Sequence, residues 1–252
     1  MRVVQPRQPI LNVPPVVVAL LALLCVVHAV REWVLPEDIS RVLSWSMAFV
    51  PARYDSSALT DGLIPGGRGA GIWSFVSYGL IHADWTHLIV NSVWLLAFGS
   101  PVARRFGAGR FLLFFALTIV GGALAHLATH AGELAPTIGA SGGVSGMMAA
   151  AARFAFEPGG SLDFRNADRD QADRVPAAPL LVALRNPRVV AFLGVWFGLN
   201  LLFGLGSWNL VGDNQSVAWE AHVGGFLAGL LLFSLFDPVG QSPDVEGRPT
   251  LH

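Results

Sequence analysis

Long apolar runs alternate with shorter polar connections along most of the chain, and this pattern predicts its helices. The runs predict membrane-spanning helices over about 14–34, 83–103, 111–130, 141–156, 189–206 and 218–236. About 20 apolar residues are needed to cross the hydrocarbon core of a bilayer. The run from 141 to 156, of about 16 residues, is too short for this. We therefore expect its helix to begin below the membrane surface, with Ser141 inside the protein.

The connections differ in character. Residues 35–80 contain several prolines and a glycine-rich stretch at 65–71, so they do not form one helix. Their clustered Leu, Trp and Phe side chains predict short amphipathic pieces in the headgroup region. Residues 157–188 are polar and carry both charge signs, which predicts a loop outside the bilayer. We divide the chain into an N-terminal segment (1–13), a membrane domain (14–236) and a tail (237–252).

The composition strengthens the membrane interpretation. The 252 residues are 53% hydrophobic and 13% charged, whereas average soluble domains carry about 25% charged residues. The fold class we predict is an all-α membrane protein, a six-transmembrane-helix bundle in contact with membrane lipid. A secretory signal at the N-terminus is the alternative for the first run, but the run leads into Arg31-Glu32-Trp33 without a cleavage site. The net charge of −1 and the lack of a basic patch argue against a nucleic-acid partner.

The arginines predict how the bundle is oriented. Six spans place both termini on one side, and twelve of the 16 basic residues, all of them arginine, then fall on that side, with four opposite. Because positive charge concentrates in cytoplasmic segments, we expect cytoplasmic N- and C-termini in a plasma membrane, the bacterial inner membrane. Ser141 then lies in the outer half of the bilayer.

Polar residues inside membrane spans are costly, and each is therefore a candidate for function. Ser141, His87, Asn91 and His222 fall on three predicted helices at a similar depth. A serine hydroxyl becomes a nucleophile when a base takes its proton, and histidine is the usual base. We therefore predict Ser141 as nucleophile and His222 as base. Because no carboxylate is obviously placed to orient His222, we predict a dyad and not a triad.

Small residues predict how the dyad meets. Gly225 and Gly229 follow His222 with the spacing that lets membrane helices approach closely. Small residues also line the helix of Ser141. Free N–H groups at the start of that helix can stabilise an oxyanion. His87 and Asn91, four residues apart, lie on one helix face and offer further donors.

Other interpretations of these residues stay open. A serine in a Gly/Ala-rich membrane helix is more often a packing residue, and His222, His87 and Asn91 could form interhelix hydrogen bonds. Ser145 is a rival nucleophile, but it lies one turn deeper, past the free amides. His82 lies near His87 in the sequence, which suggests a zinc site as an alternative. We predict no metal, because neither a His-Glu-x-x-His motif nor a carboxylate on the same face accompanies them.

Taken together, the motifs resemble the rhomboid family of intramembrane serine proteases. The resemblance covers roughly residues 45–236. It is carried by Phe49-Val-Pro-Ala-Arg-Tyr54, by His82-x4-His87-x3-Asn91, by the Phe98-Gly and Arg105-Phe-Gly pattern after the second predicted helix, by Gly139-Ala-Ser-Gly142, and by Ala221-His222-x-Gly-Gly-x-x-x-Gly229.

The resemblance implies roles for these residues. Ser141 would be the nucleophile and His222 the base, and Asn91, His87 and the Ser141 N–H would form the oxyanion hole. His82, Gly139 and Gly142 would support the site, and neither metal nor other cofactor would be needed. The substrate would be the transmembrane helix of another protein, typically single-pass, entering near the second and fifth helices and cut near the outer membrane face.

One departure and two rival functions follow. Many rhomboids carry Trp-Arg in the first loop where this chain has Trp73-Ser74, which puts the internal hydrogen bonds of that loop in doubt. A non-catalytic binder or quality-control factor would recognise membrane helices without cutting them. A small-solute transporter with a broken helix at 132–141 is disfavoured, because the sequence shows neither an internal repeat nor a buried carboxylate.

Overall fold

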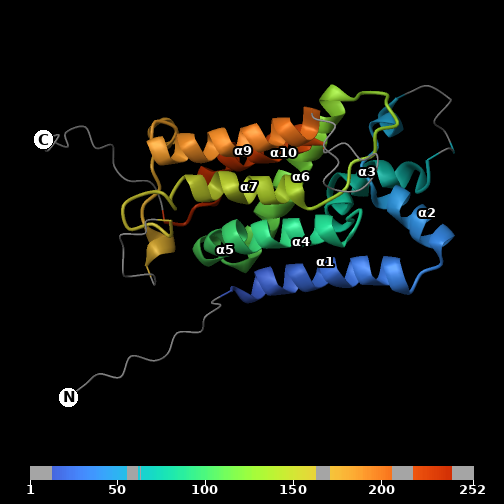
Figure 1. Cartoon of the computed structure of the whole chain (residues 1–252), viewed down its shortest axis with the longest axis horizontal. Helices are drawn as coiled ribbons and strands as arrows, with labels where there is room; N and C mark the ends of the chain where they lie inside the picture. The colour runs from blue at the N-terminus through green and yellow to red at the C-terminus, as the bar shows by residue number, and fades with distance from the viewer. Residues whose placement is uncertain (1–12, 56–61, 63, 163–170, 206–217, 240–252) are drawn as a thin grey trace, which may run out of the picture.

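Helices form the regular structure of the protein in the computed structural model, which describes residues 13–55, 62, 64–162, 171–205 and 218–239 (Figure 1). Within these residues the exception is one antiparallel bridge between Phe49 and Thr137. The helices in chain order are α1 (Pro15–Trp33), α2 (Glu37–Met47), η1 (Pro51–Tyr54), α3 (Gly67–Ser77), η2 (Tyr78–Leu80), α4 (Trp85–Trp94), η3 (Leu95–Gly99), α5 (Ser100–Phe106), α6 (Ala108–Thr129), α7 (Ser141–Ala152), η4 (Ala172–Arg174), α8 (Leu180–Ala183), α9 (Pro187–Leu205) and α10 (Trp219–Phe236).

All six predicted apolar helices are present, but not all are long enough to be membrane spans on their own. Four segments are long and apolar enough to cross a membrane, namely Pro15–Trp33, Trp85–Phe106, Ala108–Thr129 and Trp219–Phe236. The apolar stretch Pro187–Leu202 of α9 is shorter. Thus the structure supports a helical membrane bundle, and the count of six spans stays a prediction.

The fourth apolar helix is shorter than predicted. α7 has 12 residues and ends at Ala152, not near Phe156. Beyond it the N–H groups of Arg153 and Phe154 bond to carbonyls only three residues back, at 3.1 Å each, so the chain tightens into turns. A 12-residue helix spans about 18 Å at 1.5 Å per residue. This is well short of the hydrocarbon core of about 30 Å.

The second apolar helix is continuous but contains one wide turn. α4 passes through the π-helical η3 into α5, so the whole segment runs from Trp85 to Phe106. Pro101 at the start of α5 has no N–H to donate to the preceding turn. Local widening of a helix near such a residue is a common adjustment. The hydrophobic pattern had no signal for this turn.

The long helices lie side by side along the longest axis of the molecule (Figure 1). We call the end at which α7 and α10 begin the Ser141 end, and the opposite end, where α5 and α10 finish, the Arg105 end. α6, α7 and α10 pack most closely on one another. α9 is more loosely attached, through ring contacts such as Trp196 on Phe226 at 4.6 Å and Phe192 on Phe98 at 5.4 Å.

Short helices cover the Ser141 end, as Figure 1 shows for α2 and α3. The prediction of separate short pieces in residues 35–80 is confirmed, whereas their position in the headgroup region stays a prediction. Arg53 ties the pieces together, because its Nη2 donates to the carbonyls of Trp45 and Pro65 at 2.7 Å each. Residues 56–61 and 63 lie outside the described residues.

Ser74 packs within these short helices, at the position where the family resemblance leads one to expect an arginine. Its side chain is fully buried, and its Oγ lies 3.4 Å from the Tyr54 hydroxyl. That hydroxyl donates to the carbonyl of Gly71 at 2.8 Å. Partial burial raises the pKa of Tyr54, so the hydroxyl keeps its proton and its donor role. The first loop therefore has its own internal hydrogen bonds, centred on Arg53 and Tyr54.

Candidate active site

Glycines bring the start of α7 against the start of α10. A methyl group added at Gly225 would lie 2.1 Å from the carbonyl oxygen of Gly142, and one at Gly229 would lie 2.6 Å from that of Gly146. Both pairs keep the same offset in sequence, so the two helices run parallel with their backbones in contact. The predicted close approach of these two helices is confirmed. His222 lies three residues before Gly225, so by the same offset it is level with Gly139, just before the first turn of α7.

Gly142 also packs where no side chain fits. An added methyl group would lie 2.9 Å from the Tyr78 hydroxyl and 3.5 Å from the carbonyl oxygen of Ala221. The Tyr78 hydroxyl itself is buried and donates to the Ile119 carbonyl at 2.8 Å. The residue next to Ser141 is therefore held between η2, α6 and α10.

Ser141 is the first residue of α7 and is half-buried. The first bond within the helix runs from the N–H of Val144 to the carbonyl of Ala140, at 2.9 Å. Helix geometry leaves the preceding N–H groups, those of Ser141, Gly142 and Gly143, without an acceptor inside the helix. They carry the partial positive charge of the helix N-terminus, so this turn suits a developing anion.

His87 and Asn91 face this turn from α4. A methyl group added at Gly139 would lie 2.7 Å from His87 Nε2 and 3.7 Å from Asn91 Nδ2. The φ angle of Gly139 is +116°, a value that side chains strongly disfavour. Gly139 thus lets both polar groups reach the backbone two residues before Ser141.

Local hydrogen bonds orient His87 and Asn91. Asp84 caps α4 by accepting from the His87 N–H at 2.8 Å. The N–H of Ala83 lies 3.5 Å from His87 Nδ1, which therefore accepts, and this leaves the proton on Nε2, the nitrogen beside Gly139. Asn91 Nδ2 donates one of its two N–H groups to the carbonyl of His87 at 3.2 Å. Both side chains present donors near Ser141.

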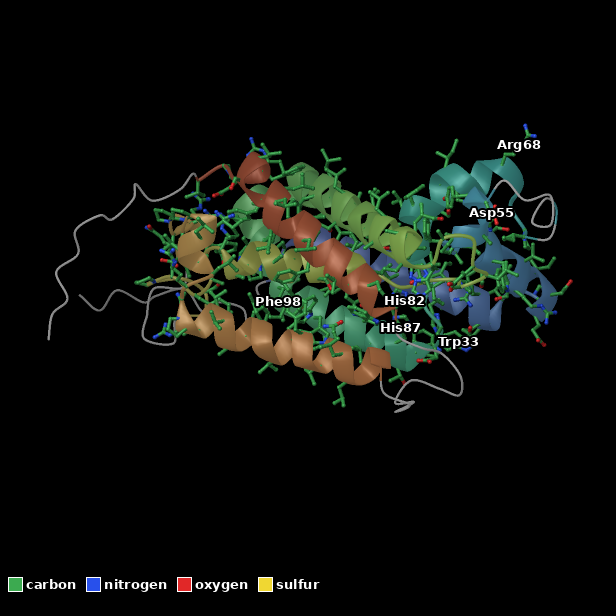
Figure 2. The ribbon with its side chains drawn as sticks, turned by 90° about the horizontal axis from the view of Figure 1, so that it is seen from above. Trp33, Asp55, Arg68, His82, His87 and Phe98 are labelled. Atoms are coloured by element: carbon green, nitrogen blue, oxygen red, sulfur yellow. The ribbon has the colours of Figure 1, made fainter. Side chains whose placement is uncertain are left out.

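His82 supports the chain just before Ser141. It is fully buried, and its Nε2 lies 3.4 Å from the N–H of Ala140. Its ring also packs edge-on against His87, with 5.1 Å between centroids. Figure 2 shows the two histidines beside each other near the start of α10, with Phe98 further along the molecule. Among the described residues no carboxylate joins these two histidines in a metal-holding group.

Asn200 is a site residue that the sequence analysis missed. It is buried in α9, and its Oδ1 lies 2.5 Å from Nδ1 of His222. Its Nδ2 donates to the Trp196 carbonyl at 2.8 Å, which fixes the amide so that Oδ1 faces the imidazole. Because an amide oxygen only accepts, Nδ1 of His222 carries the proton and Nε2 is the basic nitrogen. The available signal was a single asparagine inside an apolar helix.

Ser145, the rival nucleophile, has different surroundings. It is 4% exposed and lies in the second turn of α7. Its neighbour Gly146 packs directly on Thr118, since an added methyl group would lie 2.3 Å from Thr118 Cγ2. Ser141 is the serine at the helix start, next to the free amides and the two α4 donors.

The assembled groups can perform acyl transfer. A half-buried hydroxyl, a histidine in a fixed tautomer and several converging N–H donors are the elements that nucleophilic catalysis on an amide needs. His87 and His222 are also close enough for their charges to interact. The nucleophile, the base and the oxyanion donors of the prediction therefore come from helices that meet at the Ser141 end.

Comparisons with known proteins point to one family. A family model described as the Rhomboid domain matches residues 69–237. Rhomboid-related protein 3 of Homo sapiens is 36% identical over 81 residues, which are 32% of this chain and 20% of that protein. The chain thus matches about a fifth of the length of that relative.

Proposed function

Because the chain belongs to the rhomboid family, a family of multi-pass helical membrane proteins, we propose that it is an intramembrane serine endopeptidase using Ser141 and His222. The observation that carries this proposal is the hydrogen bond from His222 Nδ1–H to Asn200 Oδ1 at 2.5 Å. This bond assigns the proton of the ring to Nδ1 and leaves Nε2 as the basic nitrogen, as a general base requires. His222 belongs to α10, whose first turns pack directly on the start of α7, where Ser141 lies.

The proposed reaction begins with attack of Ser141 Oγ on the scissile carbonyl carbon, while Nε2 of His222 takes the hydroxyl proton. The carbonyl oxygen becomes an anion, stabilised by the Ser141 N–H and by donors from His87 and Asn91. The His222 imidazolium then protonates the leaving amine as the C–N bond breaks. A water molecule, deprotonated by His222, then attacks the acyl carbon. As the ester bond breaks, His222 returns the proton to Ser141 Oγ and the second product leaves.

Asn200 acts in this scheme as a positioning residue. Its carbonyl oxygen holds the imidazole in one orientation and stabilises the imidazolium through the Nδ1–H. This is the function of the carboxylate in a Ser-His-Asp triad, here carried by a neutral amide. Ser141 and His222 thus remain the catalytic dyad predicted from the sequence, with Asn200 as its support.

We place the substrate's access between α4 and α9. α9 contacts the rest of the bundle sparsely, and Phe192 on Phe98 is one of the contacts that close the gap toward η3. The outward-facing residues of α9 are apolar, with Val195 65% exposed, so this side of α9 suits contact with lipid or with an apolar helix. The proposed substrate is a transmembrane helix, typically of a single-pass protein, cut near the outer membrane face.

The proposed topology has six spans with both termini in the cytoplasm of the plasma membrane. α1 begins and α10 ends at the Arg105 end (Figure 1), which supports an even number of crossings. The short α7 is enclosed by α6, α10 and α4, so it does not need to span the lipid core. The arginine asymmetry then places the Ser141 end outside.

The proposal is tested by cleavage of a helical membrane substrate by the purified protein in detergent or liposomes. Ser141→Ala and His222→Ala are each expected to lower the cleavage rate by about 10³-fold or more, with the fold retained. Ser145→Ala is the matched control and is expected to stay within about twofold of the native rate. Undiminished cleavage by Ser141→Ala would contradict the proposal.

The same experiment separates the rival function, a binder that recognises membrane helices without cutting them. That function predicts co-purification of a helical substrate with the native protein and no cleavage product. It also predicts equal substrate capture by the native protein and by Ser141→Ala. The fixed tautomer of His222 favours the enzyme, because binding alone has no use for a basic Nε2.

A further inference from the structure

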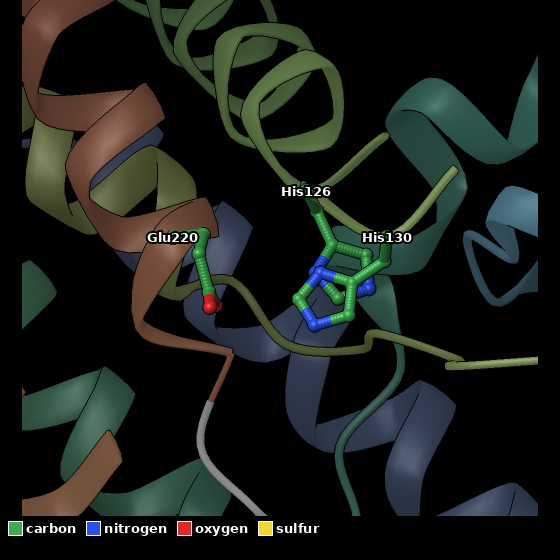
Figure 3. A group of neighbouring side chains, drawn as sticks. All are labelled: His126, His130 and Glu220. Atoms are coloured by element: carbon green, nitrogen blue, oxygen red, sulfur yellow. The ribbon is translucent and has the colours of Figure 1, made fainter. Parts of the chain in front are cut away.

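Three metal-binding side chains gather at the Ser141 end outside the proposed active site. His126 and His130 come from the end of α6, and Glu220 comes from the first turn of α10. Each offers one ligand atom, and these atoms all lie within 4.8 Å of one another. Figure 3 shows the two imidazole rings lying over one another, with the Glu220 side chain beside them. The ring centroids are 4.4 Å apart.

The hydrogen bonds of His126 leave one nitrogen available. Its Nε2 lies 2.9 Å from the carbonyl oxygen of Ala135, which can only accept, so Nε2 carries the proton. Nδ1 is then the nitrogen with the lone pair. It is buried and has no hydrogen-bond partner among the described residues, and His126 as a whole is 3% exposed. A buried acceptor without a donor is costly, and a cation would satisfy it.

His130 is arranged in the same way. Its Nδ1 lies 2.9 Å from Thr129 Oγ1. That hydroxyl is 3.1 Å from the carbonyls of Ala125 and His126, and its single proton can go to one of them. When that proton goes to a carbonyl, the hydroxyl oxygen accepts from His130 Nδ1–H, and Nε2 keeps the lone pair. Both histidines thus have one nitrogen held by a neighbour and one that keeps its lone pair, as is usual for metal-ligating histidines.

We propose that His126, His130 and Glu220 form a Zn²⁺ site. Two imidazoles and one carboxylate are a typical three-ligand zinc set, with water in the fourth position. Tetrahedral bonds of about 2.0–2.1 Å separate ligand atoms by about 3.4 Å, so the half-buried His130 and Glu220 side chains close on the ion. The metal would join the end of α6 to the first turn of α10, two residues before His222.

The test uses the full chain in detergent, without a polyhistidine tag and stripped of metal with EDTA. Zn²⁺ is titrated in competition with a chromophoric chelator. We expect one equivalent to bind, and Glu220→Gln and His130→Ala each to weaken binding by about tenfold or more. Glu133→Gln removes a nearby exposed carboxylate outside the cluster and is expected to change the Kd by less than about twofold. X-ray absorption should show N/O ligands at about 2.0–2.1 Å.

A second measurement covers variants that fold poorly. Zn²⁺ that binds only the folded protein raises its unfolding temperature, and this rise should be present in the native protein and in Glu133→Gln but absent in Glu220→Gln. Binding that is equal in native protein and Glu220→Gln, or no bound equivalent in the native protein, would overturn the site. Neither result bears on peptide cleavage, which needs only the Ser141 site.

Discussion

The polar side chains at the two ends of the bundle differ in how fully they are bonded within the protein. At the Arg105 end, Arg105 donates to both carboxylate oxygens of Asp237, at 2.7 and 2.9 Å, and to the carbonyls of Asp173 and Val175. The side chains of this ion pair are 0% and 2% exposed. At the Ser141 end, about 22 Å away along α10 at 1.5 Å per residue, His222 bonds to Asn200 through Nδ1, which leaves Nε2 as its basic nitrogen.

The difference separates a polar group that stabilises the fold from one kept for chemistry. Arg153 resembles Arg105, since its Nε and Nη2 both donate to the Ala178 carbonyl and its guanidinium lies 5.0 Å from the Phe233 ring centre. These arginines direct their donors to the protein itself. His87 and Asn91 instead place side-chain nitrogens beside Gly139, two residues before Ser141, and His222 has Nε2 as its basic nitrogen, as the proposed reaction needs.

The largest effect we expect is on stability, from a substitution at the Arg105 end. Arg105→Ala leaves the Asp237 carboxylate buried without its cation and should cost about 3–5 kcal/mol of unfolding free energy. Denaturant unfolding in detergent measures this. Arg110→Ala, an exposed arginine nearby, should change stability by less than about 0.5 kcal/mol. Equal stability of the two variants would mean that the Arg105 pair is not structural.

The next largest effect is on kcat, from loss of the proposed oxyanion donor Asn91 at the Ser141 end. Asn91→Ala should lower kcat about 10²–10³-fold, because it removes one preset donor to the developing anion. Stability should change little by comparison. Ser92→Ala is the matched control, since the Ser92 hydroxyl only bonds to the Leu88 carbonyl one turn back at 2.7 Å. A loss of stability at Asn91 as large as at Arg105 would erase the contrast between the ends.

A smaller effect is expected where the two helices touch. A methyl group at Gly225 would lie 2.1 Å from a backbone oxygen of Gly142, so Gly225→Ala must push α10 away from α7. We expect a loss of about 1–3 kcal/mol in stability, together with slower cleavage as His222 moves from Ser141. Gly194→Ala in α9 meets nothing within 4 Å and should leave both measurements unchanged or slightly improved.

The smallest effect tests the positioning of the base. Asn200→Ala removes one hydrogen bond to His222, worth about 0.5–1.5 kcal/mol, and should lower kcat roughly threefold to tenfold with KM unchanged. Asn200→Asp retains an acceptor at the same place and should recover most of the rate. If KM rises while kcat stays constant, Asn200 contacts substrate and does not hold the histidine.

Much of this arrangement could be predicted from the sequence. The helix boundaries alone place Ser141, His87, Asn91 and His222 at one depth, and small residues at i and i+4, such as Gly225, predict the contact of α7 with α10. Boundaries and small-residue spacing depend on local sequence, which is why they could be predicted without a structure.

The missed features depend on how helices are rotated against each other. α9 is apolar on nearly every side, so no amphipathic pattern indicates which face holds Asn200. From the sequence, Glu220 can be placed only relative to His222, which lies on the same helix. Its neighbours His126 and His130 come from the end of α6, which is distant in sequence. The end of α7 at Ala152 is set by turns that bring Arg153 to Ala178, a contact far along the chain.

The most direct measurement is labelling of Ser141 by a serine-directed fluorophosphonate in the purified native protein. We expect a single modified residue, Ser141, located by mass spectrometry. We also expect labelling to be lost in Ser141→Ala, strongly slowed in His222→Ala and retained in Ser145→Ala. Labelling of Ser145 instead, or labelling of Ser141 at the same rate without His222, would contradict the proposal that Ser141 is a nucleophile activated by this histidine.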